Sequence, residues 1–107
     1  MAESKFQGRL IKRIKRMFPE CQVLKNDPSY QQGILDLTLL FPGGFWASLE
    51  AKDSASAGIR PNQDYFVKKL DDMSFAAFVY PENEDEVLDA LQQAFETSRR
   101  ACVPEPQ

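Results

Sequence analysis

The sequence predicts a single α/β domain in which a mixed β-sheet is flanked by helices. Three observations support this prediction. The chain has 107 residues, which is enough for one modest hydrophobic core and too few for two. Several short apolar segments are separated by turn residues, as strands are, and apolar residues near the N-terminus recur at helical spacing. The predicted element order is αβββαβα, and the helix after the third strand makes a crossover long enough for parallel pairing with the fourth.

The first predicted helix covers residues 4–18. Its apolar residues recur every three or four positions and form one core-facing stripe: Phe6, Leu10, Ile14 and Met17. Ser4 and Gln7 match a capping box at the start of this helix. Residues 21–26 favour a short strand, and residues 27–33 favour a turn that ends at a glycine.

A hairpin is predicted in the middle of the chain. Its two strands, residues 34–41 and 45–52, are joined by the tight connection Pro42-Gly43-Gly44. Residues 53–58 are small and are typical of a loop. The next helix begins near Pro61, because proline suits the first turn of a helix.

The remaining elements are the rest of this crossover helix, a strand and a C-terminal helix. The crossover helix continues through residues 62–73, and residues 75–80 favour a strand. Asn83 with Glu86 gives a second cap signature, which opens a helical segment over residues 84–100. The chain has no internal repeat and no linker, so all elements are assigned to one domain.

Composition limits the chemistry that is available. Histidine is absent, which excludes imidazole mechanisms, so catalysis would rely on carboxylates, lysine, hydroxyls and a bound metal ion. Cys21 and Cys102 form no paired motif, which favours a reduced cytoplasmic protein. No apolar segment approaches the ~20 residues of a membrane span, and the N-terminus lacks the apolar core of a signal peptide. We assign residues 1–98 to the domain and expect residues 99–107 to be a disordered C-terminal tail.

The net charge of −3 conceals an asymmetry along the chain. Residues 1–25 carry seven Lys or Arg residues against two glutamates, whereas residues 81–107 carry two basic and seven acidic side chains. Such a polarised surface is compatible with a phosphate-binding face.

The predicted hairpin brings acidic and basic side chains together. If the hairpin is centred on Gly43, paired residues are equally distant from it, so Asp36 lies directly across from Glu50 and shares its face. Lys52 lies on that face too, because side chains two residues apart in a strand point the same way. The leucines of the first strand take the opposite face: Leu35, Leu37 and Leu39. A one-residue change of register would separate Asp36 from Glu50.

Two carboxylates at this spacing need a neutralising cation. At a separation of about 5 Å they repel by about 3 kcal/mol at an effective dielectric near 20. Lys52 supplies one positive charge, and Mg²⁺, which prefers oxygen ligands and retained waters, would supply two. The ion would lower the pKa of a bound water and polarise a phosphate oxygen, which is what phosphodiester hydrolysis needs. Taken alone, Glu50 and Lys52 favour a surface ion pair. Asp36 on the paired strand, the element order and the absence of histidine favour the metal site instead.

These residues carry a family resemblance. The segment GILDL at residues 33–37, followed by LEAKDS at residues 49–54, resembles the D…ExK active-site motif of the PD-(D/E)XK nuclease superfamily. Small phage-encoded nucleases of the virus-type replication-repair group are similar, as are, more distantly, archaeal-type Holliday junction resolvases. The resemblance covers about residues 3–95 and implies a restriction-endonuclease-like αβββαβ core. Leu35 stands where the name of the motif has proline. That proline takes no part in the chemistry, so this departure does not affect the assigned roles.

The resemblance also implies roles for individual residues. Asp36 and Glu50 would be metal ligands, with the backbone carbonyl of Ala51 as a further ligand and Mg²⁺, or Mn²⁺ in its place, as the cofactor. Lys52 would be the catalytic lysine. Gln63 resembles a glutamine that related nucleases use beside their metal site, and its other interpretation is an exposed residue near a helix N-terminus.

Further candidates lie at the N-terminal end of the chain. A carboxylate from the first helix completes the site in some relatives, and Glu3 is the candidate here, although an acidic residue at this position also suits the helix dipole. Four cations are candidate contacts to DNA phosphates, with ordinary solvated surface as the other interpretation: Lys12, Arg13, Arg16 and Lys25.

The resulting expectation is a Mg²⁺-dependent DNA endonuclease that is selective for branched DNA or non-specific, because the core fold leaves no room for a sequence-reading domain. By resemblance alone, it would be a homodimer, acting in the host cytoplasm if phage-encoded. One alternative is a non-catalytic nucleic-acid-binding or interaction module that retains the fold and binds without regard to Mg²⁺. Another is a small adaptor with incidental carboxylates, in which Asp36→Asn would leave every activity untouched.

Overall fold

The computed structural model describes residues 3–27, 33–59 and 61–102. It contains three helices, which are α1 (Glu3–Met17), α2 (Pro61–Met73) and α3 (Glu84–Cys102). Its four strands are β1 (Gln22–Lys25), β2 (Leu37–Leu40), β3 (Trp46–Ala51) and β4 (Phe75–Val79). The predicted order αβββαβα is confirmed. None of the helices within the described ranges is both long and apolar enough to cross a membrane.

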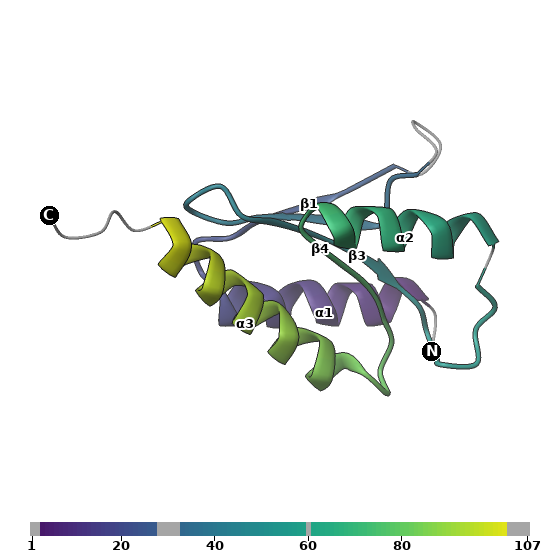
Figure 1. Ribbon diagram of the computed structural model, residues 1–107. Coiled ribbons are helices and arrows are strands. Elements are labelled where there is room, and N and C mark those ends of the chain that lie inside the picture. Colours follow the sequence, from purple (N-terminus) through teal and green to yellow (C-terminus); the bar gives the residue numbers. More distant parts are fainter. Residues whose placement is uncertain (1–2, 28–32, 60, 103–107) are drawn as a thin grey trace, which may run out of the picture.

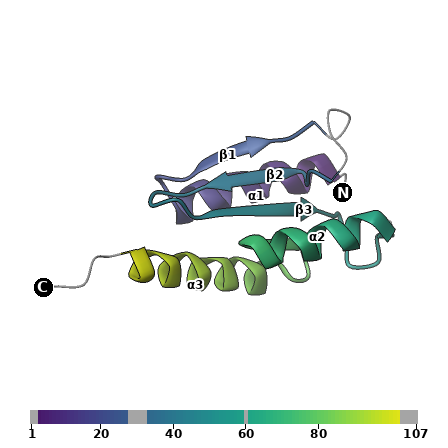
Figure 2. The ribbon, with the colours of Figure 1, turned by 45° about the horizontal axis from the view of Figure 1, so that its top comes forward.

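The strands form one mixed sheet in the order β1-β2-β3-β4. The first three strands pair antiparallel, and β4 pairs parallel to β3, as the predicted crossover through α2 requires. Figure 2 shows β1, β2 and β3 side by side, with α1 running behind them.

Helices cover both faces of the sheet (Figure 1): α1 and α3 lie on one face and α2 on the other. The predicted stripe of α1 is confirmed, since Phe6, Leu10 and Ile14 are fully buried. These side chains pack against Leu49 of β3 and Leu88 of α3 in the larger core. A smaller apolar cluster forms on the face of α2 and consists of Leu35, Val67 and Ala76.

The hairpin between β2 and β3 has the predicted register, in which Leu37 pairs with Leu49 and Leu40 with Trp46. Its connection contains Gly43 and Gly44, whose φ angles are 90° and 95°. Glycine fits here because this region of φ is disfavoured for residues with a Cβ atom. The predicted centre of the hairpin is therefore confirmed.

The start of β2 differs from the prediction. The strand begins at Leu37, and Asp36 forms a bend. The prediction that Leu35 shares the face of Leu37 is wrong, because Leu35 is buried with Val67 and Ala76 on the face of α2. The bend at Asp36 thus breaks the alternation, and burial of Leu35 in this second cluster stabilises the break.

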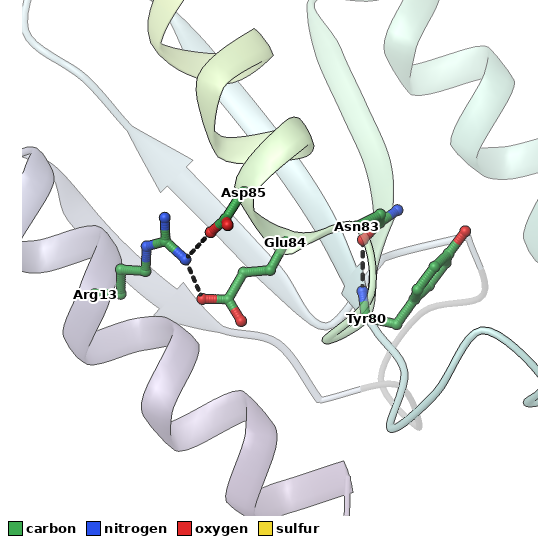
Figure 3. A network of polar contacts seen from close by, with 5 residues as sticks. All are labelled: Arg13, Tyr80, Asn83, Glu84 and Asp85. Atoms are coloured by element: carbon green, nitrogen blue, oxygen red, sulfur yellow. Dashed lines mark hydrogen bonds and ion pairs between the residues drawn. The ribbon is translucent and has the colours of Figure 1, made fainter.

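The start of α3 is confirmed, but its hydrogen bonds differ from a capping box. The side-chain Oδ1 of Asn83 accepts from the backbone N of Tyr80 at 2.9 Å (Figure 3). The backbone N of Asn83 donates to the carbonyl of Tyr80 at 3.0 Å, so it is bonded to the strand end instead of to Glu86. This arrangement ties the helix to the end of β4. The helix continues through Cys102, into the segment expected to be the tail, and residues 103–107 lie outside the described ranges.

Candidate active site at the end of strand β3

Glu50 and Lys52 are buried at the carboxyl end of β3. Glu50 is 7% exposed and Lys52 is 9% exposed, so the two side chains do not form a pair on the open surface. Even-numbered residues of β3 point to the face that α2 covers, opposite to Leu49 and Ala51 in the larger core. Buried charged groups require partners, because water is not there to solvate them.

Gln63, the third residue of α2, supplies such a partner to both groups. Its Nε2 donates to Oε2 of Glu50 at 2.8 Å, and its Oε1 accepts from Nζ of Lys52 at 2.9 Å. One amide thus joins the carboxylate and the ammonium group. The structure therefore places Gln63 in contact with Glu50 and Lys52, which is what its role as a site residue requires.

Asp36 and Glu50 are joined by backbone-to-side-chain hydrogen bonds, although the ladder between β2 and β3 ends one position earlier, at Leu37 and Leu49. The backbone N of Asp36 donates to Oε1 of Glu50 at 3.0 Å, and the backbone N of Ala51 donates to Oδ2 of Asp36 at 3.0 Å. Each carboxylate therefore accepts a backbone hydrogen bond from the opposite chain segment of the hairpin. These contacts bring the predicted residues Asp36, Glu50, Ala51 and Lys52 to one location.

Burial determines the electrostatics of Asp36. Removal from water raises the pKa of this carboxyl group above its ordinary value, while the hydrogen bond from Ala51 and the charge of Lys52 act in the opposite direction. The charged form of Asp36 is therefore disfavoured in the folded protein. A positive charge placed beside it would reverse this effect.

The atoms at this location that could bind a metal ion are oxygens. Within the described residues, no group of three or more His, Cys, Asp or Glu side chains gathers at a possible metal site. Asp36 and Glu50 supply carboxylates, and Ala51 points its carbonyl to the same side as its N–H, toward Asp36. A set of two carboxylates and a carbonyl fits Mg²⁺, which commonly uses one or two protein carboxylates and retains several waters.

The predicted contribution of Glu3 lies outside what the structure describes, because α1 begins at Glu3 but the side chain of this residue is not among those described.

The candidate DNA contacts divide into two groups. Three of them line a hollow of about 440 Å³, whose lining residues are Arg9, Lys12, Arg13, Arg16, Pro81 and Glu84. Lys25 does not line this hollow and is exposed at the end of β1. Arg9 was not among the candidates, although its spacing from Arg13 and Arg16 on one helix indicates a shared face.

Arg13 already has partners within the chain. Its Nη1 lies 2.7 Å from a carboxylate oxygen of Glu84 and 2.7 Å from one of Asp85, at the start of α3 (Figure 3). Hydrogen bonds to these two carboxylates raise the pKa of Arg13. The guanidinium group therefore connects α1 to α3, and a DNA phosphate would have to compete with two carboxylates for it.

Asn26, which follows β1 and contacts the bend at Asp36, was not among the residues predicted for the site. Its Nδ2 donates to the carbonyl of Leu35 at 2.8 Å, and its backbone N donates to the carbonyl of Asp36 at 2.8 Å. The register that pairs Lys25 with Leu37 would have placed Asn26 beside Asp36. The long connection after Asn26 offers no centre of symmetry from which this register could be predicted.

Comparison with known proteins adds no assignment, since no protein-family model, no curated protein and no solved structure matches this chain. Any functional conclusion therefore depends on the geometry of the residues themselves.

Proposed function

We propose that this protein is a Mg²⁺-dependent DNA endonuclease of the PD-(D/E)XK type, which hydrolyses phosphodiester bonds. The observation that supports this proposal is the hydrogen-bonded cluster in which Gln63 joins buried Glu50 to buried Lys52, with Asp36 beside them. Burying charged groups costs free energy that well-packed apolar residues would not. Such clusters are therefore concentrated at functional sites.

Each residue of the cluster has a separate task in this proposal. The carboxylates of Asp36 and Glu50 and the carbonyl of Ala51 would hold Mg²⁺, whose chemistry is to lower the pKa of a bound water and polarise a phosphate oxygen. Lys52 would donate a hydrogen bond to the attacking water or to the phosphate. The water oxygen would bond to phosphorus while one ester P–O bond breaks; the water would lose a proton to solvent, and the departing oxygen would take one up and leave as a hydroxyl group.

Gln63 would keep the two charged groups in position. Its amide accepts from Lys52 through Oε1 and donates to Glu50 through Nε2, so the orientation of each group depends on the same side chain. Such preorganisation matters because small displacements of catalytic groups are costly in rate. Gln63 is thus a positioning residue in the proposed site.

The proposed substrate is anionic, and the exposed cations of α1 and β1 would contact its phosphates. Lys12, Arg16 and Lys25 are exposed, whereas Arg13 is held by two carboxylates of α3. We include branched DNA as substrate, a homodimer as assembly and the cytoplasm as location in the proposal. Branched DNA and the homodimer derive from the resemblance alone, and the cytoplasmic location from the absence of a paired cysteine motif.

The test is a cleavage assay with supercoiled plasmid and a synthetic four-way junction, with Mg²⁺ and with a chelator. We expect cleavage with Mg²⁺ only, and a loss of about a hundredfold or more in Lys52→Ala. The matched control is Lys68→Ala, since Lys68 is 77% exposed and pairs with Asp64 on the surface of α2. Cleavage by Lys52→Ala at the wild-type rate would exclude the proposed role of Lys52. DNA binding that ignores Mg²⁺, without cleavage, would favour the non-catalytic module.

A further inference from the structure

The bend that presents Asp36 interrupts the ladder between β2 and β3. Within the hairpin, the backbone N of Phe41 donates to the carbonyl of Phe45 at 2.9 Å, which identifies a hydrogen-bonded pair. Such pairs alternate with non-hydrogen-bonded pairs along an antiparallel ladder. If β2 continued in the same register, Leu35 and Ala51 would be a hydrogen-bonded pair and would exchange backbone bonds.

The structure shows different partners at this place. The backbone N of Ala51 donates to Oδ2 of Asp36 at 3.0 Å, and the carbonyl of Leu35 accepts from Nδ2 of Asn26 at 2.8 Å. The side chain of Asp36 thus takes the place of a backbone acceptor. The side chain of Asn26 takes the place of a backbone donor.

Asn26 contacts the bend at three points. In addition to the bond with Leu35, its Nδ2 donates to Oγ1 of Thr38 at 2.8 Å, and its backbone N donates to the carbonyl of Asp36 at 2.8 Å. The side chain therefore spans the bend from Leu35, before Asp36, to Thr38, the second residue of β2. Nδ2 of asparagine carries two N–H groups, so it can donate to both acceptors at once.

We propose that Asn26 is a positioning residue for Asp36: it holds the bend that directs the Asp36 carboxylate to Ala51 and to the proposed metal site. This inference rests on the proposed function for its effect on catalysis. Asn26 would act through its hydrogen bonds to the carbonyls of Leu35 and Asp36. Removal of its side-chain amide releases the bend, so the Asp36 carboxylate no longer stays at the Ala51 N–H, and that N–H becomes open to solvent.

The variant Asn26→Ala tests this inference by two measurements. Hydrogen exchange reports the Ala51 amide directly, and we expect its protection to fall at least tenfold while that of Leu49, inside the ladder, is unchanged. In the cleavage assay we expect the half-saturating Mg²⁺ concentration to rise about ten- to a hundredfold. Thr38→Val is the matched control, because it removes one acceptor of Asn26 and leaves the bond to Leu35 in place; both values should stay within threefold of wild type.

The outcomes separate the inference from the proposed function. Unchanged exchange at Ala51 in Asn26→Ala would overturn the inference, whether or not the protein cleaves DNA. A wild-type chain that cleaves nothing would defeat the proposed function alone, and the exchange measurement would still decide the structural part. If Asn26→Ala does not fold, Asn26→Ser, which keeps a short hydroxyl donor, provides the same comparison at smaller amplitude.

Discussion

At the scale of single residues, Asp36 combines a cost in stability with a proposed gain in chemistry. Burial raises its pKa above the ordinary 3.8, so the folded state binds a proton more readily than the unfolded state. As the pH rises from about 3.8 through the raised pKa, this group therefore lowers the free energy of unfolding.

The variant Asp36→Asn separates the two effects. It removes the charge and keeps an oxygen that can accept from the N–H of Ala51. We expect its free energy of unfolding at pH 7, measured in urea, to equal or exceed that of the wild type, and its cleavage to fall at least about a hundredfold. A clear loss of stability would contradict the assignment of a destabilising charge, and retained cleavage would exclude Asp36 from the site of cleavage.

The sequence could predict those residues of the site whose positions follow from the symmetry of the hairpin and the periodicity of its strands. Asp36 and Glu50 follow from a hairpin centred on Gly43, and Lys52 follows from strand periodicity. The bend at Asp36 depends on packing of Leu35 on the face of α2 and on hydrogen bonds from Asn26. Those contacts come from distant parts of the chain, and no short-range pattern encodes them.

At the scale of elements, α2 and the start of β2 meet at Gly33. This glycine has φ of 94°, and a Cβ atom there would lie 2.8 Å from Cε1 of Phe66 on α2. We expect Gly33→Ala to lower the free energy of unfolding by more than the roughly 1–2 kcal/mol that a left-handed conformation costs. Gly43→Ala is the control, since Gly43 has a similar φ of 90° but open space around it. Equal losses in the two variants would contradict the close approach of Phe66.

The connection between α1 and α3 makes a different prediction for two neighbouring arginines. Arg13 bonds to Glu84 and Asp85, whereas Arg16 is exposed on the same hollow. We expect Arg13→Ala to lower stability by up to about 1 kcal/mol, less at high salt. Arg16→Ala should leave stability unchanged, weaken DNA binding and reduce the salt dependence of that binding by about one counterion. Urea unfolding measures the stability of each variant, and DNA-binding titrations over a series of salt concentrations measure its DNA binding. Equal effects of the two variants on DNA binding would show that the carboxylates do not hold Arg13.

The helix-to-helix ion pair also limits what the charge pattern of the sequence could predict. The basic N-terminal segment and the acidic segment after β4 are far apart in the chain, and the sequence indicates a polarised molecule. In the fold the two segments meet, and Arg13 is partly neutralised by Glu84 and Asp85. Element order and strand register were predictable because they depend on local periodicity and turn chemistry. Contacts between α1 and α3 depend on how two helices pack side by side on one face of the sheet (Figure 1) and had no such signal.

At the scale of the whole molecule, metal binding should appear as stability. A ligand that binds only the folded state stabilises it, and at ten times its dissociation constant it contributes about 1.4 kcal/mol. For a domain of this size that raises the melting temperature by roughly 5 °C or more. We therefore expect Mg²⁺ to raise the melting temperature of the wild type, because the cation relieves the repulsion around Asp36 and Glu50, which join β3 to the bend before β2.

Two substitutions determine whether this rise comes from the proposed site. Asp36→Asn removes a proposed ligand, so its melting temperature should not respond to Mg²⁺. Asp64→Asn removes an exposed carboxylate on α2, about half exposed and paired with Lys68, and should keep the full response. If both variants respond alike, the ion acts by general screening, and the cluster at the end of β3 does not bind it. If only Asp36→Asn loses the response, metal binding at the carboxyl end of β3 contributes to the stability of the entire cooperative unit.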